Sequence, residues 1–189
     1  MKQSWLLYVV MLFSTCAFSQ SKLTPIDKSP MDMSYYPVNY PILKIQNKAT
    51  EPLLAKVTYS RPQKNGRKVL GELVEYDKVW RLGANEATEI ELYKDARIGN
   101  NKIKKGRYSL YALPENGKWT IIFNKETDTW GAFQYEQKKD LFRYEAKTEK
   151  STEMAEVFTI MWEKNNAGGA NLLFAWDDFI FTVPFLFDK

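Results

Sequence analysis

Much of the chain alternates hydrophobic and polar residues with a period of two, which is typical of β-strands with one buried face. The alternation is clearest near the C-terminus, where Phe179, Phe181, Val183 and Phe185 share one face. Turn residues interrupt it at short intervals, and no long segment has the period of an amphipathic helix. The pattern predicts strands over residues 42–46, 56–60, 87–93, 107–113, 118–124, 141–148, 155–162, 172–176 and 179–185, with a short segment at 102–104.

These eight or nine short strands predict an all-β fold, either an antiparallel β-sandwich or a jelly-roll-like barrel. Residues 42–189 are expected to form this single domain. The strands at 107–113 and 118–124 are the best-indicated hairpin, because the residues between them include a proline followed by Asn116-Gly117. One long irregular connection, over residues 59–88, breaks the alternation. Within it, apolar residues at helical spacing over residues 69–76 predict one or two helical turns.

The first 19 residues are predicted to be a signal peptide. Lys2 precedes an apolar run over residues 5–13, and Ala17 and Ser19 are small residues suited to a cleavage site. Because the run is too short to span a bilayer, the mature chain is expected to be exported, periplasmic or secreted, without a transmembrane segment. A lipid anchor on Cys16 is the less favoured alternative, since no glycine or alanine precedes that cysteine.

Residues 20–41 are a proline-punctuated segment ahead of the predicted domain. Its four prolines exclude a continuous helix and disfavour a central strand. The segment also contains methionines and tyrosines, which solvated linkers usually lack. Part of it is therefore predicted to dock onto the domain.

The residue types that are missing narrow the chemistry. The sequence has no histidine and one cysteine, which excludes serine–histidine catalysis and metal sites built from histidine or cysteine. No cofactor or metal is indicated, and an enzyme is disfavoured, although carboxylate chemistry stays open. The sequence has 27 Lys and Arg against 23 Asp and Glu, so loss of Lys2 lowers the net charge from +4 to +3. That small, dispersed charge does not predict a nucleic-acid partner.

The irregular connection supplies the candidate site, which consists of Arg61, Arg67, Trp80, Arg81, Asn85 and Glu86. Arginine binds carboxylates, phosphates and hydroxyls, tryptophan offers a stacking face, and the asparagine amide both donates and accepts. Together they could line a polar pocket for a small anionic or sugar-like ligand. In the structural alternative, Arg61 and Arg81 pair with Glu72, Glu86 or Glu89. Trp80 and Leu82 would then join the core, while Gly83 and Asn85 supply special backbone angles.

Two other groups of residues also have two interpretations. A glycan hydrolase would need two carboxylates across a cleft, and the candidates by residue type are Glu72, Glu75, Asp77, Glu86, Asp177 and Asp178. The simpler interpretation of Asp177-Asp178 is a hairpin turn. The run Trp130-Gly131-Ala132-Phe133 predicts a hydrophobic plug over one sheet, with an aromatic platform for sugars as the functional alternative.

Several motifs together resemble a bacterial family of exported proteins of unknown function, DUF2911. They are YSRP at 59–62, Gly66-Arg67, GELV at 71–74, VWRLGANEAT at 79–88, GRYSL at 106–110, WTIIFNK at 119–125, Trp130-Gly131 and the stretch 172–184. The chain departs from the family pattern at residues 75–77, where a Pro-Tyr-Gly-like turn is commoner. The resemblance covers nearly all of the mature chain and implies export, but it assigns no activity.

The leading interpretation is therefore a non-catalytic exported module that binds a ligand or associates with the cell envelope through an arginine-rich polar site. A carboxylate-dependent glycan hydrolase is one alternative. A structural or protein-interaction domain is the other.

Overall fold

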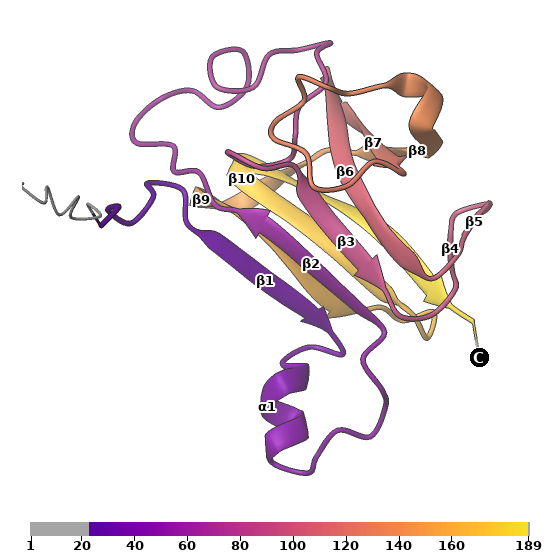
Figure 1. Cartoon of the computed structure of the whole chain (residues 1–189). Helices are drawn as coiled ribbons and strands as arrows, with labels where there is room; N and C mark the ends of the chain where they lie inside the picture. Colours follow the sequence, from indigo (N-terminus) through magenta and orange to yellow (C-terminus); the bar gives the residue numbers. More distant parts are fainter. Residues whose placement is uncertain (1–22, 189) are drawn as a thin grey trace, which may run out of the picture.

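The computed structural model describes residues 23–188 and places ten strands in two antiparallel sheets that pack face to face (Figure 1). The six-stranded sheet has the order β1 (Met31–Tyr36), β2 (Ala55–Ser60), β3 (Thr88–Leu92), β6 (Gly106–Glu115), β7 (Lys118–Asn124) and β8 (Asp140–Lys147). The four-stranded sheet has the order β5 (Asn101–Ile103), β4 (Ala96–Ile98), β10 (Ala170–Phe187) and β9 (Glu149–Lys164). The predicted all-β sandwich is confirmed. The predicted signal peptide, including Cys16, lies outside the described residues.

The core lies between the two sheets and is rich in aromatic rings. Trp119 of β7 stacks on Phe181 of β10 with ring centroids 5.0 Å apart, and Trp162 of β9 meets Phe185 at 4.9 Å. All four side chains are almost fully buried. Side chains alternate between the two faces of a strand, and these four lie on the face that points between the sheets. Burial of these large rings is the main stabilising contribution to the sandwich.

The C-terminal strand corrects one prediction. Asp177-Asp178 is not a hairpin turn: β10 is continuous from Ala170 to Phe187, and its register with β9 shifts on both sides of Asp177. The β10 residues that belong to the main core cluster are even-numbered up to Trp176 and odd-numbered from Phe179 onward. A bulge is required to keep both halves facing the core. Asp177 has a φ of 54°, a left-handed conformation that aspartate tolerates better than most residues.

The N-terminal segment contributes an edge strand. β1 pairs with β2 along its whole length, which confirms that part of residues 20–41 docks onto the domain. The strand predicted over residues 42–46 is wrong, because helix α1 (Tyr40–Ile45) lies there. Pro41 is in the first turn of this helix, where its missing N–H costs nothing. The place beside β2 that a strand at 42–46 could have taken is already occupied by β1.

Two irregular segments lie at one end of the sandwich (Figure 1). Residues 61–87 join β2 to β3, as the predicted long connection. Residues 125–139 join β7 to β8 and end in the 3₁₀ helix η1 (Gln137–Lys139). The second segment covers the outer face of the six-stranded sheet, where its Ala132 and Tyr135 pack against buried Tyr111 and Ile122.

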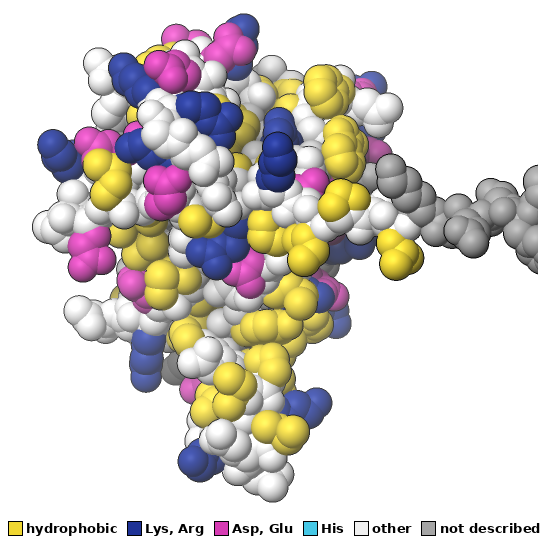
Figure 2. All heavy atoms as spheres, turned by 90° about the vertical axis from the view of Figure 1, so that its left-hand side faces the viewer, with side chains coloured by type: hydrophobic (Ala, Val, Ile, Leu, Met, Phe, Trp, Pro, Cys, Tyr) yellow, Lys and Arg dark blue, Asp and Glu magenta, His cyan; other side chains and the backbone are white. Residues whose placement is uncertain are grey.

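One side of the molecule exposes hydrophobic side chains over α1 and β1 (Figure 2). They include Met31 and Met33 of β1 and Ile42 and Ile45 of α1. None of the residues of α1 is buried, so the helix projects from the end of the sandwich opposite to the two irregular segments (Figure 1). Among the described residues, no helix has the length and apolar character needed to cross a membrane.

Candidate anion-binding site

The first half of the connection is attached to β9 and to the bulge of β10. Gln63 forms a bridge with Val157, and the side chain of Lys64 forms an ion pair with Asp177. The second carboxylate oxygen of Asp177 lies 3.5 Å from the backbone nitrogen of Val69. The bulge thus places a carboxylate under the connection, where it holds two points five residues apart.

Of the one or two helical turns predicted within this half, only a single turn forms, and no helix follows from it. Leu73 N–H donates to the carbonyl of Val69 at 3.1 Å, which closes one isolated turn, and Leu70 forms a bridge with Val74. The segment is therefore a compact loop, and the apolar side chains that suggested a helix pack onto the core from it. Short-range apolar spacing alone cannot distinguish these two structures.

The second half of the connection is attached to β6 through Trp80. The backbone N–H and carbonyl of Trp80 pair with Ala112 at 2.7 and 2.8 Å. The indole is buried, stacks on Trp176 with centroids 5.8 Å apart and meets Phe158 edge-on at 5.1 Å. Gly83 follows where the chain passes close to β2: a Cβ atom there would lie 3.0 Å from the carbonyl oxygen of Ser60.

A cavity of about 320 Å³ lies between the two halves of the connection, the β10 bulge and the N-terminal segment. Its lining residues are Lys28, Ser29, Pro62, Gln63, Asn65, Arg67, Leu73, Trp80, Arg81, Gly83, Ala84 and Trp176. Three of these side chains are cationic, and no carboxylate among the described residues lines the cavity. The two indoles and Leu73 provide an apolar wall. The cavity is therefore positively charged on one part of its surface and apolar on another.

Arg81 is the most unusual group in the cavity. Its Nε atom is buried and has no hydrogen-bond partner within the described part of the chain. Burial lowers the pKa of the guanidinium from its usual value, and no neighbouring carboxylate offsets that effect. A buried N–H of a guanidinium that has no acceptor is energetically costly and is rarely left unmatched. An anion in the cavity would supply the missing acceptor.

Arg67 lies at the exposed rim of the same cavity. Its Nε donates to the carbonyl of Lys64 at 2.9 Å, and its Nη2 donates to the carbonyl of Gln63 at 2.8 Å. These two bonds fix the orientation of the guanidinium on the loop. Because both acceptors are neutral carbonyls, the positive charge of Arg67 is not balanced by a carboxylate and adds to that of Arg81.

Comparison with known proteins identifies the family. A family model described as a protein of unknown function, DUF2911, matches residues 43–185. The chain belongs to this family. No curated protein and no solved structure matches it. The matched residues of this DUF2911 protein include most of the cavity lining, among them Arg67, Arg81 and Trp176, whereas Lys28 and Ser29 lie before them.

The structure of this DUF2911 protein brings together three of the six candidate residues. Arg67, Trp80 and Arg81 line the cavity, whereas Arg61, Asn85 and Glu86 do not. The backbone carbonyl of Asn85 accepts from Gly131, and Asn85 has the left-handed φ of 59° expected for it in the structural alternative. Glu86 is exposed and forms a backbone bridge with Trp130 of the second irregular segment.

Arg61 has a structural role, although not with the predicted partners. Its Nη1 pairs with Asp32 of β1 at 3.0 Å, its Nη2 donates to the Thr159 hydroxyl at 3.0 Å, and its Nε donates to the Phe158 carbonyl at 3.3 Å. The side chain therefore links β1 to β9, at the edge where the two sheets meet. The predicted pairing of Arg61 with a glutamate of the connection is wrong.

Nine of the twelve lining residues were not among the six candidates, and Lys28 and Trp176 are the most informative of them; Asp177, which supports the cavity from outside its lining, was also missed. Trp176 lines the cavity and Asp177 holds the loop that carries Arg67. The change of parity between Trp176 and Phe179 could have revealed a bulge, and a bulge is a place where a strand reorients a side chain toward a site. Lys28 has no such signal, because its position depends on how the N-terminal segment docks.

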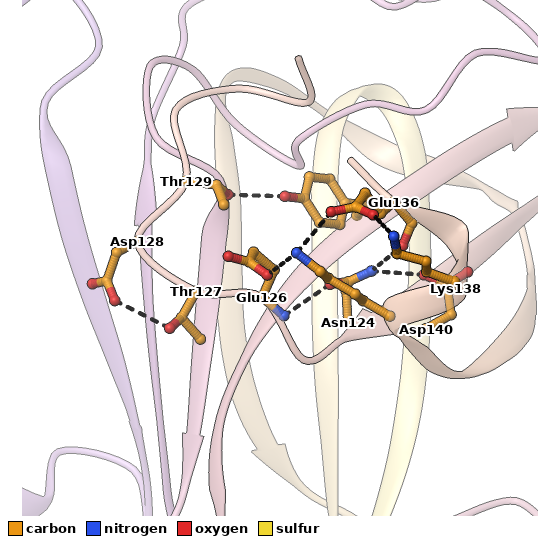
Figure 3. Close-up of polar contacts among 10 residues, drawn as sticks. Asn124, Glu126, Thr127, Asp128, Thr129, Glu136, Lys138 and Asp140 are labelled. Carbon is orange, nitrogen blue, oxygen red and sulfur yellow. Dashed lines mark hydrogen bonds and ion pairs between the residues drawn. The ribbon is translucent and has the colours of Figure 1, made fainter. Parts of the chain in front are cut away.

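The second irregular segment has a different electrostatic structure (Figure 3). Lys139 forms ion pairs with Glu126 and Glu136, and Lys138 pairs with Glu136 as well. The two lysines lower the pKa of Glu136 to about 2, and the two glutamates raise the pKa of Lys139 to about 12. Each of these four side chains has a partner of opposite charge, so this part of the segment is close to neutral.

The exposed aromatic residues of this segment correct another prediction. Trp130 and Phe133 have 60% and 85% of their surface exposed, so the run 130–133 is not a hydrophobic plug, apart from Ala132. Two of the six carboxylates considered for a hydrolase form ion pairs: Glu75 pairs with Lys78, and Asp177 pairs with Lys64. Within residues 23–188, no cluster of three or more His, Cys, Asp or Glu could hold a metal ion.

Proposed function

We propose that the protein is a non-catalytic exported binding module, and that the cavity beside Arg81 holds a small anionic ligand. The observation that carries this proposal is the buried, unpartnered Nε of Arg81 in a cavity lined by cations and by no carboxylate of the described chain. A carboxylate or phosphate group would give the Arg81 guanidinium the negatively charged hydrogen-bond acceptor that it lacks.

The size and the walls of the cavity favour a particular kind of anion. About 320 Å³ is at the lower end of the range for small-molecule sites. Trp80, Trp176 and Leu73 are positioned to contact a hydrocarbon portion, while Arg67 and Lys28 lie at the rim. A small organic anion with an apolar part therefore matches the cavity better than a bare inorganic ion does.

A non-catalytic role is supported by what surrounds the cavity. Hydrolysis by a pair of carboxylates requires two acids on either side of the scissile bond. Glu72 and Glu75, the nearest candidates along the connection, accept from Lys68 N–H and pair with Lys78, respectively, outside the cavity lining. Binding by arginine, amide and indole groups needs no such pair.

Export is proposed from the N-terminal sequence pattern. Cleavage after Ser19 would leave about ten residues ahead of β1, of which Lys28 and Ser29 reach the cavity rim. Mass spectrometry of the protein isolated from its own cell should give a mature chain that starts near Gln20. An intact N-terminus, or one modified with lipid at Cys16, would contradict this part of the proposal.

The binding proposal is tested by a thermal-shift screen of phosphate, sulfate and mono-, di- and tricarboxylates at constant ionic strength. An anion at about 100 times its Kd should stabilise the wild type by roughly 2.7 kcal/mol. Arg81→Gln should abolish the shift. Arg97→Gln, at an exposed arginine of β4, is the matched control and should retain it. If no anion shifts the wild type, or if Arg81→Gln responds equally, the proposal fails.

A further inference from the structure

A second hollow lies on the segment over residues 125–139 and is lined by carboxylates, which the arginine cavity lacks among the described residues. Its volume is about 350 Å³, and its lining residues are Glu126, Phe133, Gln134, Tyr135, Glu136 and Lys139. It combines one highly exposed aromatic ring with carboxylate, amide and ammonium groups. None of these residues lines the cavity beside Arg81.

The ring of Phe133 is placed by the glycine two residues before it. A Cβ atom on Gly131 would lie 2.9 Å from both Cδ2 and Cε2 of the ring, which is closer than van der Waals contact allows. The φ of Gly131 is 66°, and its N–H donates to the carbonyl of Asn85 at 2.9 Å. Glycine is thus needed both for the turn and for the close approach of the ring. The ring lies on the backbone and still exposes 85% of its surface.

Ion pairs and hydrogen bonds link the polar groups around the ring. Lys139 is fixed between Glu126 and Glu136. The Tyr135 hydroxyl donates to Asp140 at 2.7 Å, and its ring meets Tyr111 edge-on at 5.2 Å. Burial and the hydrogen bond to Asp140 raise the pKa of Tyr135 to about 12, so that its hydroxyl stays a donor. A site that is ordered in advance loses little entropy when a ligand binds.

We propose that this hollow binds a neutral sugar ring of a glycan, with one face of the sugar against Phe133. The C–H groups on one face of a pyranose carry partial positive charge and are attracted to the negative face of an aromatic ring. Its hydroxyls both donate and accept, so they need acceptors such as Glu126 and Glu136 and donors such as Lys139 and Gln134. The charges of the two glutamates are balanced by Lys138 and Lys139, which favours a neutral ligand.

The test uses saturation-transfer NMR with the mature protein and a panel of neutral oligosaccharides. The panel contains β-1,4-linked glucose, β-1,4-linked N-acetylglucosamine, α-1,4-linked glucose, mannose and galactose oligomers. At least one member should receive saturation from the protein. Phe133→Ala should weaken its affinity by about tenfold or more, and Phe133→Trp should preserve it. Because Phe133 is so exposed, both variants are expected to fold; circular dichroism checks this.

Two controls separate this site from the arginine cavity and from general stickiness. Arg81→Gln should leave sugar binding unchanged, and Met154→Ala, at another exposed apolar residue, should do the same. The proposal is overturned if no oligosaccharide receives saturation, or if Phe133→Ala binds as well as the wild type. It is also overturned if sedimentation shows a dimer that Phe133→Ala abolishes and sugars do not affect, because the ring would then serve a protein interface.

Discussion

The connection over residues 61–87 and the segment over residues 125–139 lie at the same end of the sandwich, yet their charges are arranged in opposite ways (Figure 1). In the second segment, Glu126 and Glu136 form ion pairs with Lys138 and Lys139 of the same segment. Figure 3 shows Glu126, Glu136 and Lys138 close together. In the first, Arg67 and Arg81 border a cavity that no carboxylate of the described chain enters. Their common position at one end of the sandwich therefore does not explain why the charges are paired in one segment and unpaired around the cavity of the other.

The difference indicates separate roles for the charges of the two segments. Ion pairs on the protein surface contribute little stability each, but a network of them orders the segment that carries it. An unmatched guanidinium that is partly buried destabilises the free protein, since its charge is desolvated without compensation. This loss of stability is offset when an anion binds to the guanidinium. The first segment is thus suited to binding an anion, and the second to presenting an ordered neutral surface.

The largest effect is expected at Asp177, which holds the first segment in place. Asp177→Asn keeps the side-chain shape and tolerates the left-handed backbone, but it removes the charge opposite Lys64, whose side chain is only 18% exposed. An uncompensated and mostly buried lysine should lower the free energy of unfolding by about 2 kcal/mol. Urea denaturation measures this, with the exposed neighbour Asp178→Asn as the control. Equal stability of the two variants would show that Asp177 does not anchor the connection.

The next largest effect is expected for Arg61, whose guanidinium has three hydrogen-bond partners, in comparison with Arg81, whose buried Nε has none within the described residues. Arg61→Met loses a carboxylate, a hydroxyl and a carbonyl partner, and should destabilise the protein by about 1–2 kcal/mol. Arg81→Met loses no partner and removes a desolvated charge, so its free energy of unfolding without added anion should equal or exceed that of the wild type. Urea denaturation in buffers free of polyvalent anions measures both. A larger loss for Arg81→Met than for Arg61→Met would show that Arg81 is part of an internal network.

The smallest effect is the pH dependence of the matched segment. Lys138 and Lys139 depress the folded-state pKa of Glu136 to about 2 from an ordinary value of 4.5. A depressed carboxyl pKa stabilises the folded state above pH 4.5, and this contribution is lost as the pH falls from 4.5 toward 2. Melting temperatures between pH 6 and 2 should therefore fall less steeply for Glu136→Gln than for the wild type. Identical acid profiles would indicate that the Glu136 ion pairs are absent in solution.

The sandwich could be predicted from the sequence because the alternation of hydrophobic and polar residues in its strands shows which face of each strand is buried. Phe179, Phe181, Val183 and Phe185 alternate because one face of β10 is packed and the other is not. The same local pattern was misleading at residues 42–46, where the competition between β1 and a following strand for the edge of β2 decided the structure. That competition depends on pairing between distant segments, which periodicity does not report.

The site was harder to predict than the fold. Arginine and tryptophan in the connection indicated where to look, but not that Arg61 would pair with Asp32, 29 residues earlier in the chain. Nor did they indicate that the buried Nε of Arg81 would have no partner within residues 23–188. Arginine side chains are long enough to reach several partners, so sequence spacing does not determine the choice. For residues 130–133 the sequence left both a hydrophobic plug and an exposed aromatic platform open, and only the structure shows that Phe133 is exposed.

The most direct test of anion binding at Arg81 follows the arginine side chains themselves. In protein labelled with ¹⁵N-arginine, each of the six arginines gives one Nε–H signal, and variants assign them. Titration with the anion that gives the largest thermal shift should move the Arg81 signal most and the Arg67 signal next, with saturation at the same concentration. The signals of Arg61, Arg107 and Arg143, which already have carboxylate partners, should stay in place. An Arg81 signal that does not move while the anion still stabilises the protein would show that the anion binds elsewhere.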